Sequence, residues 1–168
     1  MSTKQSLTCA GTNPAPVPMG MEEIKVRESV AVTAAEIAIT NVVQLLVLPA
    51  NCVPTSYLLD CSDLDTGTVA LLLDFGLLGT TVAANGQRTH DATISVEAED
   101  GGDEWIDAST LAQAGGIALD TASAALHRVL MAVTPVNYDR MVAVVVATAA
   151  ATAAAGTIAC ELGYRAAR

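Results

Sequence analysis

The chain of 168 residues carries eight lysines and arginines against 18 aspartates and glutamates, a formal net charge of −10. Nucleic-acid binding needs clustered basic side chains that neutralise phosphates, so this balance argues against a nucleic-acid partner and equally against an anionic membrane surface. Hydrophobic residues make up 52% of the chain but aromatic residues only 3%, which leaves Val, Leu, Ile and Ala to build the core of one domain.

The first 22 residues are predicted to form an extended arm, followed by a single domain over residues 23–168. Pro14, Pro16 and Pro18 alternate with Ala15 and Val17 and favour an extended, non-helical path. Such an arm is either disordered or laid over a neighbouring subunit, and the sequence leaves both open. The opening residues lack the apolar core of a secretory signal peptide.

The first half of the domain predicts four strands. Residues 23–33 alternate apolar and polar side chains with only Glu28 breaking the apolar row, the pattern of a strand with one face in the core. Thr33 and Glu36 fit a capping box, which predicts a short helical turn over 34–39. Three apolar runs between Pro and Gly punctuation predict buried strands at 42–48, 53–60 and 69–75, the last ending at Gly76 and Gly79.

The second half mixes loops, one short helix and further strands. Residues 80–88 are predicted as a polar loop with an Asn85-Gly86 turn, before a short strand at 93–98. Asp107 is predicted to cap a helix over 108–114, entered at Trp105 and closed by glycines. The remaining apolar runs predict three more strands, the last two forming a hairpin, at 128–133, 140–148 and 157–165.

Together these elements predict an all-β fold, a jelly roll or β-sandwich of about eight antiparallel strands with one or two short helices and an extended N-terminal arm. Residues 141–160 carry no charge, but Ala, Thr, Val and a glycine make a poor membrane span and are better explained as two strands and a loop. No membrane partner is therefore expected.

No catalytic residue, cofactor or metal site is predicted. His90 and Asp91 are adjacent, so in a strand they point to opposite faces and cannot form a relay, and His127 lies too far away to complete a zinc site. Several carboxylates resemble part of a calcium-binding loop, but the residue order of an EF-hand loop is absent. Turn formation and capping are the favoured interpretation for them, and a cation site is the alternative, at Asp60, Asp63 and Asp65 or in the acidic stretch 97–107.

The four cysteines are predicted to be reduced thiols, because none form a C-x-x-C pair and two lie inside apolar strands. A disulfide between Cys52 and Cys61 is the less favoured alternative. The cysteines at issue are Cys9, Cys52, Cys61 and Cys160.

A run from Val43 to Asp65 has the pattern L-P-A-x-x-V-P-x-x-x-x-L-D followed by S-D-L-D. It resembles the small jelly-roll cement proteins of short-tailed phage heads, of the Bordetella-phage type. V-A-V-T-A-A-E-I-A at 30–38, Q-A-G-G at 113–116 and A-A-A-G-T-I before a Tyr-Arg ending agree in the same order. The arm 1–22 and the acidic segment 97–103 depart from that pattern.

The resemblance implies a decoration protein of the virion, made in the host cytoplasm, that sits on the outer face of the head and bridges subunits of the major capsid protein. Many copies that each grip two neighbours would stabilise the shell. Another phage structural role, such as a head-fibre base, neck or tail component, is the main alternative. A carbohydrate-binding jelly roll is less favoured, since it would need exposed aromatic side chains.

Two surfaces are predicted to make these contacts. Self-association into a dimer or trimer is expected along two apolar strands, through Val43, Leu45, Val47, Val144 and Val146. Contact with the major capsid protein is expected at loop tips and along the arm, through Pro14, Pro16, Pro18, Met19 and Met21.

Overall fold

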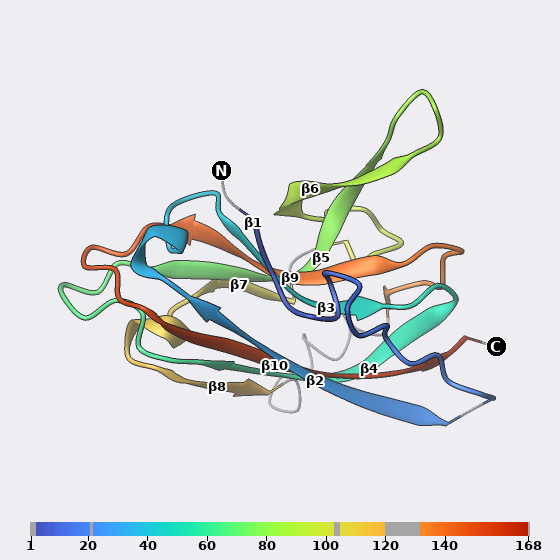
Figure 1. The fold of residues 1–168 in the computed structure, drawn as a ribbon, viewed down its shortest axis with the longest axis horizontal. Helices are drawn as coiled ribbons and strands as arrows, with labels where there is room; N and C mark the ends of the chain where they lie inside the picture. Colours follow the sequence, from blue (N-terminus) through green and yellow to red (C-terminus); the bar gives the residue numbers. More distant parts are fainter. Residues whose placement is uncertain (1–2, 21, 103–104, 120–131, 168) are drawn as a thin grey trace.

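Two curled β-sheets face each other in the computed structural model, which describes residues 3–20, 22–102, 105–119 and 132–167 (Figure 1). One sheet has the strand order β1-β3-β9-β5-β6, with β7 also paired to β5, and the other has the order β2-β10-β4-β8. The strands are β1 (Thr3–Gln5), β2 (Glu23–Val32), β3 (Val42–Leu48), β4 (Cys52–Cys61), β5 (Leu72–Val82), β6 (Arg88–Ile94), β7 (Ile106–Ser109), β8 (Gly116–Leu119), β9 (Arg140–Thr148) and β10 (Gly156–Ala166).

The all-β sandwich predicted from the sequence is confirmed, and its arrangement is consistent with a jelly roll. Among the described strands, β1 and β3 run parallel and the other pairs are antiparallel. The bounds predicted for β3 and β9 are those observed, and those of β2, β4 and β10 differ from prediction by at most one residue at either end. These strands were predictable because at least one of their faces is buried along most of their length.

The space between the sheets is filled mainly by aliphatic side chains, with one aromatic cluster at its centre. Tyr57, Phe75 and Trp105 have ring centroids 5.1 to 5.7 Å apart, and each is at most 3% exposed. The cluster contains the only Trp and the only Phe of the chain. Since edge-to-face and stacked rings of this kind add to the area they bury, the few aromatic residues are concentrated where β4, β5 and β7 meet.

The two 3-10 segments among the described elements are single turns. The first is η1 (Ala34–Glu36), where the capping box predicted at Thr33 and Glu36 is present, with the Thr33 amide donating to Glu36 Oε2 at 2.7 Å. The helix predicted over 108–114 is wrong: β7 ends at Ser109 and only the turn η2 (Leu111–Gln113) follows. The reason is tertiary, because β7 pairs with β5 and the Ala108 amide donates to Asp74 Oδ1 at 3.0 Å.

The longest departure from the predicted strands is the hairpin of β5 and β6, which projects from the sandwich (Figure 1). β5 begins three residues later than predicted, leaving Val69 56% exposed, and continues through Gly76 and Gly79 to Val82. The loop predicted over 80–88 shrinks to 83–87, with Gly86 at φ +81°, and β6 replaces the strand predicted at 93–98. Neither face of this hairpin is continuously buried, so its sequence shows no apolar alternation.

The hairpin predicted from the last two strands is also wrong. β9 pairs with β3 and β5, whereas β10 pairs with β2 and β4 in the opposite sheet. The connection 149–155 therefore crosses between sheets, and local sequence carries no signal that separates a crossover from a hairpin. Of the strand predicted at 128–133, residues 128–131 lie outside the described part of the chain, and Val133 forms an isolated bridge with Asp100.

Replacing Leu45 with alanine should lower the free energy of unfolding by about 2–5 kcal/mol, because this fully buried side chain would leave a cavity between the sheets. Val69→Ala, at a 56% exposed position, is the matched control and should change stability by less than about 0.5 kcal/mol. Urea titration at neutral pH measures both. Equal effects of the two variants would contradict the observed packing.

Candidate functional site

The start of the arm is attached to the first sheet. β1 pairs with β3 so that Thr3 lies opposite Val42, and the Ser6 amide donates to the Gln44 carbonyl at 2.9 Å. The side chains of Gln5 and Gln44 are also hydrogen bonded, at 2.7 Å. Gln44, the one polar residue in the apolar run of β3, is thus explained by the arm that it anchors.

The rest of the arm crosses to the second sheet. Thr8, which is 5% exposed, donates its hydroxyl hydrogen to the Glu28 carboxylate on β2. Further along, the Tyr164 hydroxyl of β10 donates to the Pro16 carbonyl at 2.6 Å. Glu28 breaks the apolar face of β2 because it meets the arm there, and the arm bridges the two sheets along the side where β2 and β3 approach each other (Figure 1).

The arm residues predicted to contact the capsid differ in exposure. Met19 is 85% exposed, Pro14 and Pro16 are also exposed, and Pro18 is buried. Met21 lies outside the described residues. Two further apolar side chains of the arm point to solvent and were not singled out from the sequence, Leu7 at 55% and Val17 at 65% exposure. Capsid contact through the arm remains a prediction.

A shallow groove of about 300 Å³ separates the arm from the first sheet. The arm forms one wall, and the end of β3 with the start of β9 forms the other. Asp139 at the rim is its one acidic residue, and its Oδ1 accepts a hydrogen bond from the Ala50 amide at 2.8 Å. The apolar wall residues are Cys9, Pro14, Ala15, Val17, Val47, Pro49 and Met141.

Four of the five side chains predicted to mediate self-association belong to the core of the single chain. Val43, Leu45, Val144 and Val146 are each at most 1% exposed, and Val47 alone among the five is half-buried, in the groove wall. The opposite face of β3 and β9 is covered within the chain, by a second apolar cluster that includes residues of β5 and β6. Self-association itself remains a prediction.

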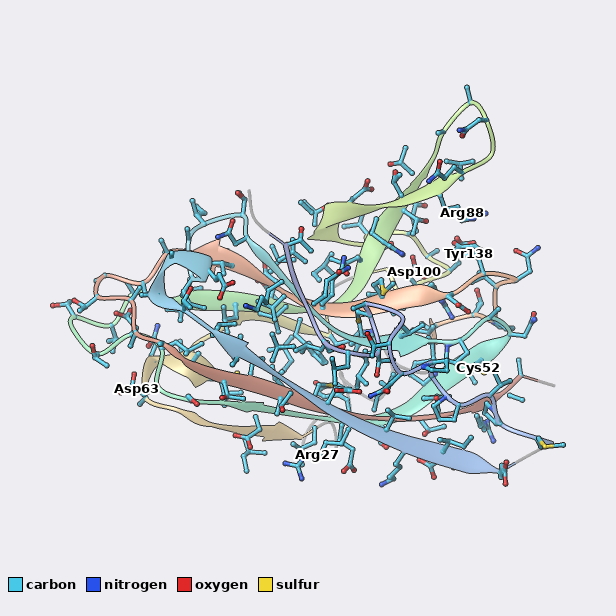
Figure 2. The ribbon with its side chains drawn as sticks, viewed as in Figure 1. Arg27, Cys52, Asp63, Arg88, Asp100 and Tyr138 are labelled. Atoms are coloured by element: carbon cyan, nitrogen blue, oxygen red, sulfur yellow. The ribbon has the colours of Figure 1, made fainter. Side chains whose placement is uncertain are left out.

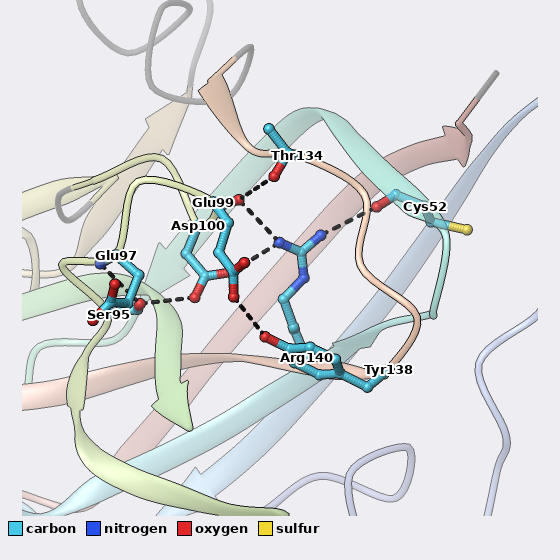
Figure 3. Close-up of polar contacts among 8 residues, drawn as sticks. All are labelled: Cys52, Ser95, Glu97, Glu99, Asp100, Thr134, Tyr138 and Arg140. Carbon is cyan, nitrogen blue, oxygen red and sulfur yellow. Dashed lines mark hydrogen bonds and ion pairs between the residues drawn. The ribbon is translucent and has the colours of Figure 1, made fainter. Parts of the chain in front are cut away.

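A buried ion pair joins the beginnings of β4 and β9 to the loop after β6 (Figure 3). Arg140 is 1% exposed and Asp100 is 4% exposed, and Arg140 Nη1 donates to Asp100 Oδ1 at 2.8 Å. Arg140 also donates to the backbone carbonyls of Glu99 at 3.3 Å and Cys52 at 3.2 Å. Ser95 donates to the second oxygen of Asp100 at 2.7 Å, so both carboxylate oxygens are satisfied.

The same cluster also contacts the projecting hairpin close to its turn. The Tyr138 hydroxyl donates to Glu99 Oε1 at 2.9 Å, and the Arg88 guanidinium of β6 lies 3.6 Å from the centre of the Tyr138 ring. Burial, followed by the hydrogen bond to Glu99, raises the pKa of Tyr138. Part of the predicted acidic stretch is therefore used for structure: Asp100 neutralises a buried cation and Glu99 orients Tyr138 (Figure 3).

Asp65 has the turn-forming role predicted for the carboxylates after β4. Its carboxylate accepts backbone hydrogen bonds from Ala70 and Leu71 on one loop, and from Ala151 and Thr152 on the crossover between β9 and β10, at 2.8 to 3.4 Å. These amides, that of Thr152 first, lower the pKa of Asp65 from 3.8 to about 2. The carboxylate thus clamps two loops at one end of the sandwich.

The cysteines are free thiols, and the geometry excludes the alternative bridge. Cys52 and Cys61 stand at opposite ends of ten-residue β4, about 30 Å apart at the usual rise per residue. Figure 2 labels Cys52 at one end of the molecule and Asp63, two residues beyond Cys61, at the other. Burial raises the pKa of Cys61 to about 12, so this thiol stays protonated at neutral pH.

His90 and Asp91 are consecutive residues of strand β6, so their side chains lie on opposite faces of that strand. Asp91 Oδ1 accepts a hydrogen bond from the Thr81 hydroxyl at 2.8 Å, and burial lowers the pKa of half-buried His90. Within the described residues, no group of three or more His, Cys, Asp and Glu is placed to hold a metal ion. No helix of the described segments is long and apolar enough to cross a membrane.

Comparison with known proteins identifies two solved structures that share this fold, and both are phage capsids. A chain of the structure titled "Capsid of Ralstonia phage GP4" is 29% identical, with a TM-score of 0.73 and 99% of each chain covered. A chain of the "Cyanophage Pam1 capsid asymmetric unit" is 23% identical, with a TM-score of 0.54, over 92% of this chain and 94% of the other. No protein-family model and no curated protein matches the sequence.

Replacing Asp100 with asparagine should lower the free energy of unfolding by about 3–5 kcal/mol, because it leaves the Arg140 guanidinium buried without its counter-charge. The double variant Asp100→Leu with Arg140→Met should recover most of the loss, since it removes both charges. Glu161→Gln breaks the exposed Lys25–Glu161 pair and should change stability by less than about 1 kcal/mol. Chemical denaturation distinguishes these outcomes.

The Asp65 clamp should make stability depend on acid. A carboxylate with a depressed pKa stabilises the fold fully above its unfolded value of 3.8, and that contribution is lost as the pH falls through about 2. The stability difference between the natural chain and Asp65→Asn should therefore be largest at pH 6 and shrink steadily between pH 4 and pH 2. Thermal unfolding across this range tests it, with Asp107→Asn at an exposed position as control.

Proposed function

We propose that this chain is a cement protein that binds the outer face of a phage head and bridges subunits of the major capsid protein. The observation that carries the proposal is the likeness, over 99% of both chains at 29% identity, to a chain of a Ralstonia phage capsid. The resemblance noted in the segment from Val43 to Asp65 points to the same role. A capsid-associated structural role is the coarser statement that both solved neighbours support.

The physical character of the fold suits a mechanical task. Among the described residues there are two buried polar clusters, one around Arg140 and one around Asp65. Each cluster joins segments that are far apart in the sequence. A rigid body of this kind can transmit load between two neighbours that it touches. Many copies make modest contacts strong, because each bound contact raises the effective concentration of the next.

Contact with the shell is assigned to the arm and its groove. Leu7, Val17 and Met19 expose apolar side chains on a segment that carries no charge between Gln5 and Gly20. Apolar side chains held on a fixed backbone lose little conformational freedom when a partner covers them. The hydrogen bonds of Thr8 and Tyr164 hold this part of the arm in place.

Heads that lack this chain should keep their shape but release DNA at a lower temperature than complete heads. Adding the purified chain should raise the release temperature back to that of complete heads. Quantitative gel analysis of purified heads should find it at a copy number near that of the major capsid protein. A scarce chain confined to the neck or tail would contradict the cement role and favour the alternative structural part.

Replacing Val17 and Met19 together with aspartate should reduce binding to undecorated heads by at least tenfold, because the contact would then bury two charges. Val69 and Ile117 are exposed to similar degrees on the far loops and on β8, and their double aspartate variant is the matched control. Co-sedimentation with heads measures both. Equal binding by the two variants would show that the arm does not contact the head.

A further inference from the structure

One edge of the second sheet has no neighbouring strand along ten residues, although the arm reaches its middle at Glu28. β2 is the terminal strand of that sheet and pairs with β10 from Glu23 to Val32. A strand paired on one side directs every second amide and carbonyl outward. Among the described residues, no backbone hydrogen bond reaches this outer edge, and the arm bonds to β2 only through the side chains of Thr8 and Glu28.

The cations that make no buried or short contact within the fold gather beside this edge. Among the described basic residues, Lys4 pairs with Glu36, Arg88 stacks on Tyr138 and Arg140 is buried. The three that remain lie on the outer face of β2 and β10, where Figure 2 shows Arg27 projecting away from the sandwich. They are Lys25, Arg27 and Arg165.

The carboxylates that accompany these cations lie toward β10 and β4 and not toward the outer edge of β2. Glu23 leans over Gly163 and accepts a hydrogen bond from Thr55 of β4 at 2.7 Å, which turns it away from the open side. Glu161 lies on β10, on the side away from the open edge, opposite Arg27 in the register and 4.0 Å from Lys25. Arg27 forms no ion pair within the described part of the chain, although the chain as a whole carries a net charge of −10.

The other face of β2 is apolar and incompletely covered. Val30 and Val32 are buried, but Ile24 and Val26 in the first half of the strand are only half-buried against the core. A strand added at this edge would set its alternate side chains beside Ile24 and Val26 on one face, and beside Lys25 and Arg27 on the other.

We propose that the free edge of β2 binds an extended segment of the shell protein in which apolar and acidic residues alternate. The apolar side chains complete the cover over Ile24 and Val26, the carboxylates pair with Lys25 and Arg27, and the backbone edge supplies the hydrogen bonds of strand addition. The same cations discourage a second β2 from pairing there, because like charges on facing strands repel. This inference rests on the cement role proposed above.

The test compares the purified chain with the same chain on reconstituted heads. Amide hydrogen exchange in the peptide covering 23–32 should slow at least tenfold on the heads, because the outer amides gain acceptors. Arg27→Glu should weaken head binding about tenfold, while Arg165→Glu, an identical charge change one strand further from the edge, should weaken it less than threefold. Unchanged melting temperatures of both variants establish that they are folded.

The outcomes separate the two proposals. Normal head binding with unprotected β2 amides, or equal losses for the two arginine variants, overturns strand addition and leaves the cement role standing. Failure of the natural chain to bind heads overturns the cement role and the shell segment together. Protection of β2 in the free chain, accompanied by dimer in sedimentation, shows that a second copy fills the edge and overturns the proposal.

Discussion

The ion pair between Arg140 and Asp100 is the contact on which most of the distant segments depend. Removing a guanidinium from water is tolerable only when its counter-charge and its hydrogen-bond acceptors are already in place. Those acceptors come from the start of β4 and the loop after β6, while the arginine itself opens β9. Tyr138 extends the cluster to Arg88, so the projecting hairpin is oriented by the same charges that join the sheets.

A consequence of this construction is that the broad apolar strands are not available to partners. β3 and β9 bury one face between the sheets and the other under β5 and β6, and the arm covers the side between β2 and β3. What remains for contact is narrower and more specific: the uncharged outer side of the arm with its groove, and the edge of β2. These two surfaces differ in chemistry, since one is apolar and the other pairs an open backbone with cations.

Strands with a buried face and the extended arm were predictable from the chain, whereas the projecting hairpin and the surroundings of Trp105 were not. The bounds of β3 and β9 follow from apolar runs between Pro, Asn and polar residues, and the turn η1 follows from its capping box. The β5–β6 hairpin escaped prediction because neither of its faces is buried throughout. Trp105 was placed at a helix, although its amide bonds to the Phe75 carbonyl at 2.8 Å, a contact between residues thirty positions apart.

The sequence by itself determined the fold class and the strongest strands, because alternation and turn residues act over a few neighbouring positions. Only the tertiary structure decided that Asp100 is a counter-ion, that Asp65 clamps two loops and that Val43 and Leu45 are core residues. The tertiary structure also decided which strand lies at the edge of the second sheet. Both β2 and β10 are predicted as strands from the sequence, but strand pairing places β10 inside the sheet and β2 at its edge. Each of these depends on contacts between residues far apart in the chain, which no local pattern encodes.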